Sequence, residues 1–391
     1  MAERTPALIL YARRVPSTRG ALIETVGRVV GALGTLERPV PKGLGRFFSV
    51  LDRNSYASLS YVIDWLEAFR TAPALQPVCC NIVDLGEWPR IRRLVKTAPL
   101  TVILHSAAGD DISLISRLSS TLLGRKGKLL TFFGNEYTRM PSKIAFARAI
   151  EADFIASQLP MTAATWLYAD CTRSRVLPAP AALNPTRYHP LKIPRVIDVG
   201  FRGDLYPYSI GDQERTRILE FFRQLGSRHG LHVDIAYSRE SGARWHQFLS
   251  SCHGIVGAES GTLYLERDDH TERAVVEYLA SHAAASFTDV YQKFFANYSN
   301  PVSGKAISSR HFEAIGTQTC QILLEGQYNG ILEAGRHYFS VQADLSDASE
   351  VIERFKDPTE RTRIAEEAHA YVLAHHTYQH RVRHLLELVL G

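Results

Sequence analysis

The sequence contains no apolar run that approaches the roughly 20 residues needed to cross a bilayer as a helix. The short apolar run near its start is followed by Arg13 and Arg14, a pattern that predicts neither a signal peptide nor a spanning helix. Its five cysteines form no C-x-x-C pair, and an odd count with one adjacent pair does not indicate a disulfide framework. We therefore expect a cytoplasmic protein, at most peripheral to a membrane.

Several functional signatures are also missing. There is no G-x-G-x-x-G fingerprint of nicotinamide enzymes, no internal repeat and no low-complexity segment. The formal net charge is only +5, and no stripe of Lys and Arg alternates with aromatic residues. A mild positive charge fits a phosphate-bearing ligand or loose attachment to an anionic membrane surface, so we expect no nucleic-acid partner.

What the chain has is the composition of an ordinary globular protein, with 45% hydrophobic and 22% charged residues. Its 391 residues exceed a typical single core, so two domains are expected. Five prolines fall within residues 178–194. This segment is the best candidate for a boundary, between an N-terminal domain at 1–185 and a C-terminal domain at 186–391.

Short apolar runs alternate with helical patterns in both halves. The alternation predicts parallel sheets, and hence an α/β protein with two Rossmann-like domains. In the first half, strands are expected at 7–12, 78–85, 100–106, 128–136 and 152–158, with helices at 87–97, 111–124, 141–151 and 161–169. In the second half, strands are expected at 195–203, 231–237, 253–260, 320–325 and 337–341, and a long helical region follows Pro358.

The stretch K-A-I-S-S-R-H-F-E-A-I-G-T, at 305–317, predicts a helix that opens near Ser308 or Ser309. Arg310 and Glu313 would share one face of it. Free N–H donors and Arg310 suit a phosphate, and Glu313 could accept hydrogen bonds from a ribose diol, so the helix start would suit a nucleotide. The alternative is an ordinary surface ion pair.

A glycine-flanked arginine, Gly200-Phe201-Arg202-Gly203, ends the first strand of the second half. Glycines would let the backbone approach a phosphate, and Arg202 would add charge. The alternative is a tight turn with a solvated arginine.

In the first half, His105 and Glu136 follow predicted strands, where parallel sheets bind ligands. Either could take a proton from an acceptor hydroxyl as a general base. His105 would have Asp110 and Asp111 nearby. The alternatives are a satisfied histidine at a strand end and a glutamate that caps the next helix.

Two patterns could suggest a metal, but neither has a complete ligand set. Asp268 and Asp269 lack a third ligand at a defined spacing, so a solvated loop is the better interpretation. His376, His380 and His384 are four apart without a carboxylate or cysteine nearby, and packing explains them better. We therefore predict no metal site.

The order R-H-F-E-A-I-G-T followed by an apolar strand resembles the C-terminal domain of group 1 glycosyltransferases of the GT-B fold. The bacterial polysaccharide and spore-maturation-type members are closest. V-G-F-R-G and the tail H-H-T-Y-Q-H-R-V-R-H-L-L resemble the same group. The resemblance implies two Rossmann-like domains facing a central cleft, with the last helix packing back across them. The N-terminal domain would take the acceptor and the C-terminal domain a nucleotide sugar.

The resemblance also implies roles for single residues. Glu313 would hold the ribose, and the residues before it would approach the diphosphate. The implied nucleotide-sugar site comprises Gly200, Arg202, Gly203, Ser309, Arg310, His311, Glu313 and Thr317. Many members carry a second glutamate eight positions before the one that matches Glu313, where this chain has Lys305. That departure leaves the sugar contacts, and retention or inversion, open.

The expected activity is metal-independent transfer of a sugar from a UDP- or GDP-linked donor, with no further cofactor. The acceptor would be a glycan, a lipid-linked molecule or a small molecule, in the synthesis of surface polysaccharide or another glycoconjugate. Two alternatives stay open. One is a nucleotide-sugar-binding protein without catalysis, and the other is an epimerase or phosphorylase of the same shape.

Overall fold

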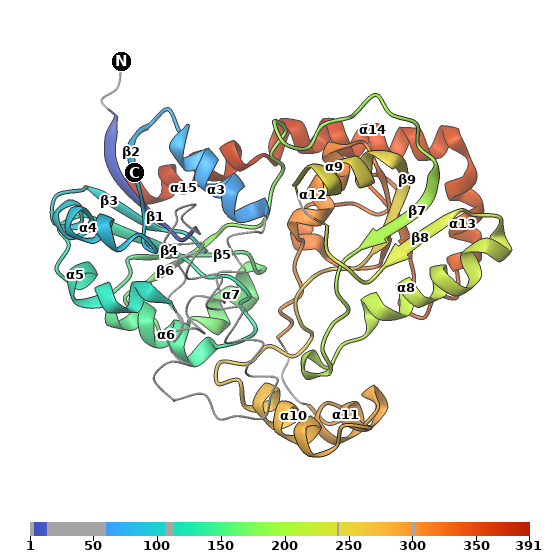
Figure 1. The fold of residues 1–391 in the computed structure, drawn as a ribbon, viewed down its shortest axis with the longest axis horizontal. Helices are drawn as coiled ribbons and strands as arrows, with labels where there is room; N and C mark the ends of the chain where they lie inside the picture. Colours follow the sequence, from blue (N-terminus) through green and yellow to red (C-terminus); the bar gives the residue numbers. More distant parts are fainter. Residues whose placement is uncertain (1–3, 14–59, 106–112, 241, 299–301) are drawn as a thin grey trace.

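The computed structural model describes residues 4–13, 60–105, 113–240, 242–298 and 302–391. Its strands form two parallel sheets, which define two lobes lying side by side (Figure 1). The first lobe has strand order β2-β1-β3-β4-β5-β6, with β1 (Thr5–Tyr11), β2 (Leu75–Asn81), β3 (Leu100–Ile103), β4 (Lys128–Phe132), β5 (Phe154–Ser157) and β6 (Arg175–Pro178). The second has order β11-β10-β9-β7-β8, with β7 (Ile197–Arg202), β8 (Val233–Ala236), β9 (Cys252–Gly257), β10 (Cys320–Leu324) and β11 (Phe339–Val341).

Helices lie in most of the connections between successive strands, as is usual in parallel sheets. The first lobe has α3 (Ser60–Arg70), α4 (Trp88–Val95), α5 (Ser119–Leu123), α6 (Met140–Ala149) and α7 (Met161–Leu167). The second half contributes α8 (Glu214–Leu225), α9 (Gly242–Ser251), α10 (His270–Ser281), α11 (Phe287–Phe294), α12 (Ser309–Gly316), α13 (Ala348–Lys356), α14 (Pro358–His375) and α15 (Tyr378–Leu390). The predicted α/β class with two Rossmann-like units is confirmed. None of the described helices combines the length and apolarity needed to span a membrane.

The inner strands of both sheets are largely buried, which explains why their sequences read as continuous apolar runs. Every residue of β3 and of β10 is buried. The described strands start or end within a few residues of the predicted ones. The sequence interpretation omitted β6, which is only four residues long and ends at a proline.

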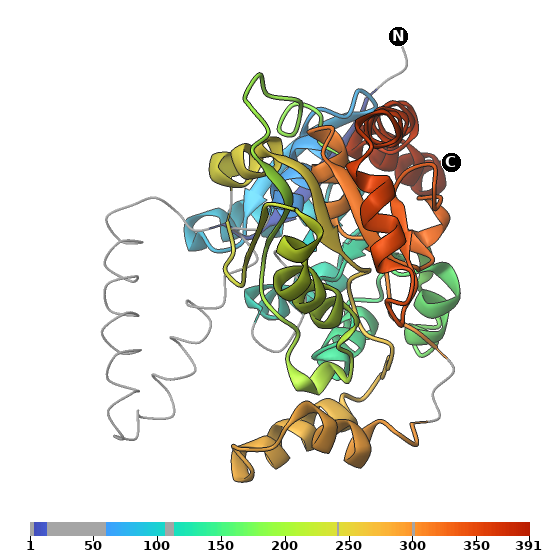
Figure 2. The same ribbon diagram turned by 90° about the vertical axis from the view of Figure 1, so that its right-hand side faces the viewer.

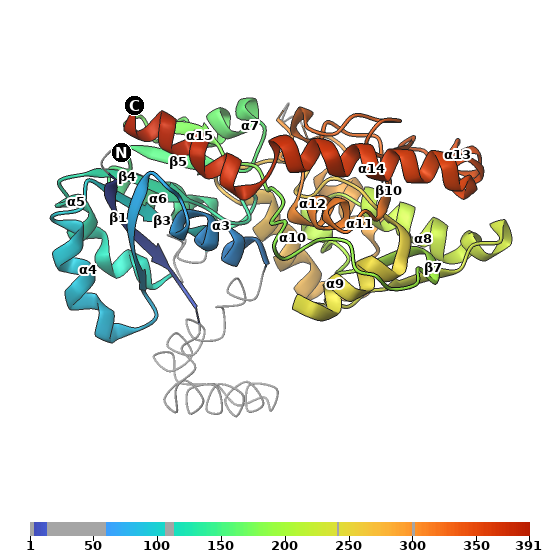
Figure 3. The same cartoon turned by 90° about the horizontal axis from the view of Figure 1, so that it is seen from above.

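The last helix returns to the first lobe, as predicted. Seen from above, α14 runs along the second lobe and α15 continues onto the first (Figure 3). Its apolar face packs in the same core as Trp65 and Phe69 of α3, through Tyr378, Val382, Leu385, Leu386 and Val389. Residues 378–390 therefore follow the second lobe in sequence but stabilise the first.

Two chain segments cross between the lobes and are joined to each other. The N–H of Leu183 donates to the carbonyl of His376 at 2.9 Å, and the N–H of Tyr378 donates to the carbonyl of Leu183 at 3.0 Å. Asp64 of α3 anchors the first crossing, because its carboxylate accepts from Asn184 at 2.7 Å and from Arg187 at 3.0 Å. Both crossings are thus fixed to the first lobe.

Asp64 makes stability at this crossing depend on pH. Burial raises its pKa to about 7, opposed by Asn184 and Arg187 and assisted by the charges of Glu313 and Glu67. Because the unfolded carboxyl titrates near 3.8, only the folded state keeps the proton between about pH 4 and pH 7. The contribution of Asp64 to the free energy of unfolding therefore falls as pH rises through that window, by no more than about 4 kcal/mol.

We expect the Asp64→Asn variant to lose this component of the pH profile. Urea unfolding at pH 5 and pH 8 measures it, as the difference between wild type and variant at each pH. The variant should lose less stability than the wild type between pH 5 and pH 8. Parallel profiles for the two proteins would show that Asp64 titrates normally.

An excursion between β9 and α12 carries α10 and α11, which stand apart from both sheets in two perpendicular views (Figures 1 and 2). It contacts the first lobe through its acidic residues. Both carboxylate oxygens of Asp269 accept from the N–H of Met140 at the start of α6, at 3.1 and 3.0 Å. Glu272 accepts from the Thr138 hydroxyl at 2.9 Å. The predicted solvated loop at Asp268 and Asp269 is wrong for Asp269, which is buried and caps a helix of the other lobe.

Candidate functional site

The helix start predicted near Ser308 is confirmed as the start of α12. Ser308 has extended backbone, and its N–H donates to Nδ1 of His311 at 3.0 Å. The side chain of His311 thereby caps the backbone N–H of Ser308 at the helix start. The ring of His311 is buried against Tyr328, and burial lowers its pKa to about 4. His311 is therefore neutral at physiological pH and orders the helix start without adding charge.

Glu313 is 4% exposed, so the alternative of a surface ion pair with Arg310 is wrong. Its Oε2 accepts a hydrogen bond of 2.6 Å from Nε1 of Trp245 on α9. Trp245 was not predicted from the sequence, because it lies 68 positions away and only the packing of α9 on α12 brings it close. The indole fixes the carboxylate in one orientation.

Arg310 joins α12 to the end of β7. Its Nη1 donates to the carbonyl of Arg202, and its guanidinium lies over the rings of Phe201 and Trp245 at 5.7 and 5.6 Å. A Cβ on Gly203 would lie 2.2 Å from the same Nη1, so any larger residue there would require the guanidinium to move. The two sequence features singled out in the second half, the glycine-flanked loop and the helix start, meet here.

The other residues of the glycine-flanked loop have local partners. The side chain of Arg202 pairs with Asp234 of β8 at 2.7 Å and lies 4.0 Å over the ring of Phe248. It is not a solvated arginine. A Cβ on Gly200 would lie 2.5 Å from Sγ of Cys252 and 2.7 Å from Cζ of Phe248, so this glycine lets β7 and α9 pack closely.

Thr317 lies at the opposite end of α12 from Ser309 and Arg310. Eight helical residues span about 12 Å. The hydroxyl of Thr317 donates to the carbonyl of Ala314 at 2.9 Å, and its carbonyl accepts from Arg195 at 2.8 Å. The structure does not bring Thr317 together with the helix start.

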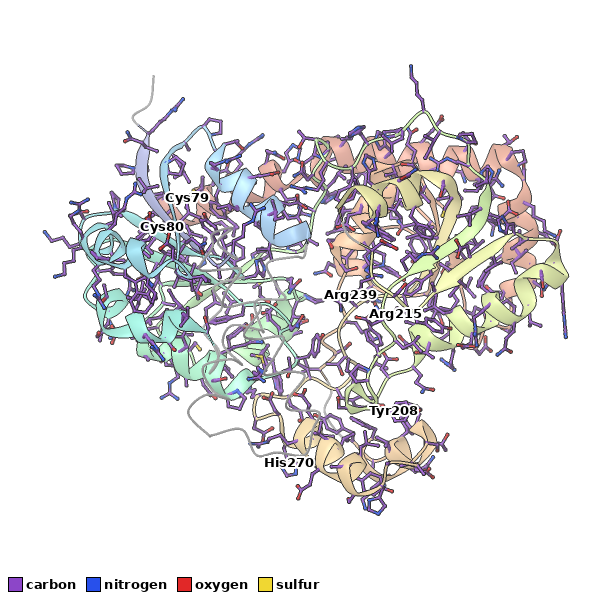
Figure 4. All side chains as sticks on the ribbon, viewed as in Figure 1. Cys79, Cys80, Tyr208, Arg215, Arg239 and His270 are labelled. Atoms are coloured by element: carbon purple, nitrogen blue, oxygen red, sulfur yellow. The ribbon has the colours of Figure 1, made fainter. Side chains whose placement is uncertain are left out.

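Two further arginines lie beside Arg310 and were not predicted. Arg215 stacks over Tyr206 at 3.7 Å and donates to the carbonyl of Asp204 at 2.9 Å. Arg239 follows β8 and pairs with the carboxylate of Asp204 at 2.5 Å. Figure 4 shows Arg215 and Arg239 on the side of the second lobe nearest the first.

The electrostatics of this cluster are those of a site for an anion. Burial, together with the positive charges of Arg215 and Arg239, lowers the pKa of Arg310 to about 10, against the opposing effect of Glu313 and Asp204. Arg215 also lies in the first turn of α8, where the helix dipole disfavours a cation. An arginine in the first turn of a predicted helix was the one sequence feature that could have indicated Arg215 as a site residue. We call Arg215, Arg239 and Arg310 the arginine cluster.

Lys305 occupies the position where many group 1 glycosyltransferases have a glutamate. Its ammonium pairs with buried Asp212 and with Glu214 at 3.0 Å. Burial alone would lower the pKa of Lys305, but the two carboxylates raise it, so the lysine stays charged. The ion pairs hold the segment before α12 against the start of α8.

In the first lobe, His105 and Glu136 are both buried. His105 lies among aromatic rings, 4.9 Å from Phe132 and 6.1 Å from Trp65, and burial lowers its pKa to about 3. Its predicted neighbours, residues 110 and 111, lie outside the described residues.

The carboxylate of Glu136 accepts from the Ser157 hydroxyl at 2.7 Å, the Tyr168 hydroxyl at 2.8 Å and the Gln158 N–H at 3.0 Å. Burial raises its pKa. Because Asp269 caps α6, the alternative that Glu136 caps that helix is wrong.

The three histidines at 376, 380 and 384 each contact a different residue nearby in the sequence. His380 caps the start of α15 with Thr377 at 2.8 Å, and His376 accepts from Arg381 at 2.9 Å. His384 lies 3.8 Å from Glu387. Across the described ranges, no three His, Cys, Asp or Glu side chains gather in a way that could hold a metal ion.

Residues 215–387 match the sequence model of a family described as glycosyl transferase-like. The match begins at Arg215 and includes all of α12, so the predicted resemblance to glycosyltransferases is confirmed for this part of the chain. A search of curated proteins finds no match.

One solved structure, the first described here, supports the fold. An α-glucosyltransferase in complex with UDP and a 13-mer DNA is similar over 100% of both chains, with 8% identity and a TM-score of 0.50. HepE from Anabaena, in complex with UDP-glucose, is similar over 98% of this chain and 99% of its own, with 11% identity and a TM-score of 0.48. Sucrose-phosphate synthase from Thermosynechococcus elongatus is similar over 98% of both chains, with 13% identity and a TM-score of 0.44.

Proposed function

We propose that this glycosyltransferase takes a UDP- or GDP-linked sugar on its second lobe and transfers the sugar to an acceptor hydroxyl presented by the first. The observation that carries the proposal is the arginine cluster at the start of α12. Asp204 offsets only part of its positive charge, and Arg202 is already paired with Asp234. A diphosphate would supply the missing negative charge through charge-assisted hydrogen bonds.

The placement of Glu313 supports a nucleotide over a simple phosphate. Its carboxylate is fixed by Trp245 one turn along α12 from Arg310, so ribose and diphosphate could be held by the same helix. The first-turn N–H groups of α12 would add donors that have no partner within the helix. Ser309 and Gly203 belong to this site through their backbone.

In the transfer step, the bond between the anomeric carbon and the diphosphate oxygen breaks, and a bond to the acceptor oxygen forms. The acceptor proton must pass to a base, and the diphosphate leaves with increased negative charge. Preorganised guanidinium groups and N–H donors stabilise that charge. Neither predicted base is favourably set for this step, because burial lowers the pKa of His105 to about 3 and three hydrogen bonds already occupy the carboxylate of Glu136.

Because cationic side chains can neutralise the leaving group, we propose that the reaction needs no metal ion. Turnover should be the same in 5 mM Mg²⁺ and in excess EDTA, to within roughly twofold. A loss of activity in EDTA that Mg²⁺ or Mn²⁺ restores would contradict this part of the proposal. Glycan, lipid-linked or small-molecule acceptors would suit a role in glycoconjugate synthesis, with the enzyme in the cytoplasm or at the inner face of a membrane.

A panel of UDP-, GDP- and dTDP-sugars tests the function directly. The proposal expects release of nucleoside diphosphate together with sugar attached to an added acceptor. Binding of nucleotide without turnover would indicate a non-catalytic protein. Conversion of the donor to an epimer or a sugar phosphate, independent of any acceptor, would indicate an epimerase or phosphorylase.

A further inference from the structure

One side chain of the second lobe contacts both the first lobe and the segment that leads into α12. Asn329 lies in the turn Tyr328–Gly330 that follows β10, with φ of 54°. Its Oδ1 accepts from the N–H of Ile307 at 2.8 Å, and its Nδ2 donates to the carbonyl of Gln158 at 3.0 Å. Asparagine tolerates this left-handed backbone better than most residues, so the turn aims the amide without a glycine.

Each end of this bridge is attached to a part of the proposed reaction site. Ile307 directly precedes Ser308, which caps α12, so the bond to Ile307 fixes the approach to the arginine cluster. Gln158 follows β5 in the first lobe, and Glu136 holds its N–H at 3.0 Å. The chain of contacts therefore runs from Glu136 through Gln158 and Asn329 to the start of α12.

The amide suits this position because its two ends differ. Its oxygen accepts from the backbone of the second lobe, and this bond does not depend on the position of the first lobe. One nitrogen donates to the first lobe, which is possible only when the lobes are close. The contacts of Asp269 with Met140 and of Glu272 with Thr138 also join the lobes, but they do not reach α12.

We propose that Asn329 is a positioning residue that couples the approach of the two lobes to the donor site, an inference that rests on the function proposed above. The Ile307 bond sets the geometry of nucleotide binding. The Gln158 bond holds the first lobe, with the acceptor, against the donor. Nucleotide affinity should therefore depend on the first bond alone, whereas transfer should depend on both.

Two substitutions separate the bonds. Asn329→Asp keeps an oxygen for Ile307 and a residue type that tolerates the left-handed backbone, but it turns an oxygen toward the Gln158 carbonyl. Asn329→Gly keeps the backbone conformation and removes both bonds. Asn297→Asp makes the same chemical change at an exposed turn residue and serves as the matched control.

Calorimetry with UDP or GDP and turnover of the nucleotide sugar selected by the panel are the readouts. For Asn329→Asp, we expect kcat to fall at least tenfold while the nucleotide Kd changes less than twofold. For Asn329→Gly, both should worsen, and for Asn297→Asp, neither. Wild-type kcat in Asn329→Asp would overturn the proposal, as would equal losses in Kd and kcat, which a merely structural role would give.

Small-angle scattering on the nucleotide-free protein measures the radius of gyration, and so tests the effect of the Gln158 bond on lobe separation without any nucleotide bound. Asn329→Asp should give a larger radius of gyration than the wild type and the Asn297→Asp control, whereas an unchanged radius would overturn the coupling. If the wild type binds no nucleotide, the proposed function fails, and the scattering result still decides whether Asn329 holds the lobes together.

Discussion

Replacing Arg310 with alanine is expected to weaken UDP or GDP binding by roughly 10- to 100-fold, since a hydrogen bond to a charged group contributes about 1.5–3 kcal/mol. The guanidinium lies at the start of α12 with its orientation set by the carbonyl of Arg202 and by Gly203. Removing it takes away one of the three charges of the arginine cluster. Calorimetric titration of the folded variant, checked by circular dichroism, measures the loss.

The ligand series identifies which group Arg310 contacts. Affinity for the nucleoside should change little in Arg310→Ala, and affinity for the diphosphate should change most, because only the phosphates meet the guanidinium. Arg310→Lys should recover only part of the affinity, since an ammonium cannot form the planar fork. Arg336→Ala is the control, because this arginine pairs with Glu333 and Glu367 on the surface. Equal losses for nucleoside and diphosphate would contradict a phosphate contact.

Glu313→Ala is expected to weaken nucleotide binding by a similar factor, but through the ribose. The substitution removes the acceptor oxygens and leaves Nε1 of Trp245 buried without its 2.6 Å partner. Leaving a buried donor unsatisfied costs about 1–3 kcal/mol, so some stability is also lost. Binding of UDP should therefore be compared with binding of 2′,3′-dideoxy-UDP, which lacks the ribose hydroxyls.

In the wild type, the dideoxy compound should bind more weakly than UDP, and in Glu313→Ala the two should bind alike. Trp245→Phe keeps an aromatic ring beneath Arg310 but removes the N–H that donates to Glu313. It therefore separates the effect of orienting the carboxylate from the effect of removing it. It should lower affinity less than Glu313→Ala does. A preference for UDP over the dideoxy compound that persists in Glu313→Ala would place the ribose elsewhere.

Local patterns were sufficient to predict most elements of the fold. The start of α12 follows from the two serines before an amphipathic run, and its capping by Ser308 needs only residues three apart. The buried strands β3 and β10 were recognisable as short apolar runs. Such features depend on neighbours in sequence, which is why they can be read without a structure.

The partners of the site residues could not be predicted, because they depend on sheet register and helix packing. Arg202 was expected to face a phosphate, but its side chain lies against Asp234, which the parallel pairing of β7 and β8 places beside Gly200. Glu136 was expected to act as a general base or to cap the next helix, yet Tyr168 donates to it from 32 positions away. Arg215 and Arg239 belong to no recognisable sequence motif. Their position beside Arg310 follows from the loop at residues 202–204, where Asp204 contacts Arg215 and Arg239 and the carbonyl of Arg202 contacts Arg310.

A crystal structure with bound UDP or GDP tests the central claim most directly. The account predicts that the diphosphate lies at the start of α12, within hydrogen-bonding distance of Arg310 and of at least one of Arg215 and Arg239, with the ribose at Glu313. A nucleotide bound wholly on the first lobe, or no binding at millimolar nucleotide, would contradict it.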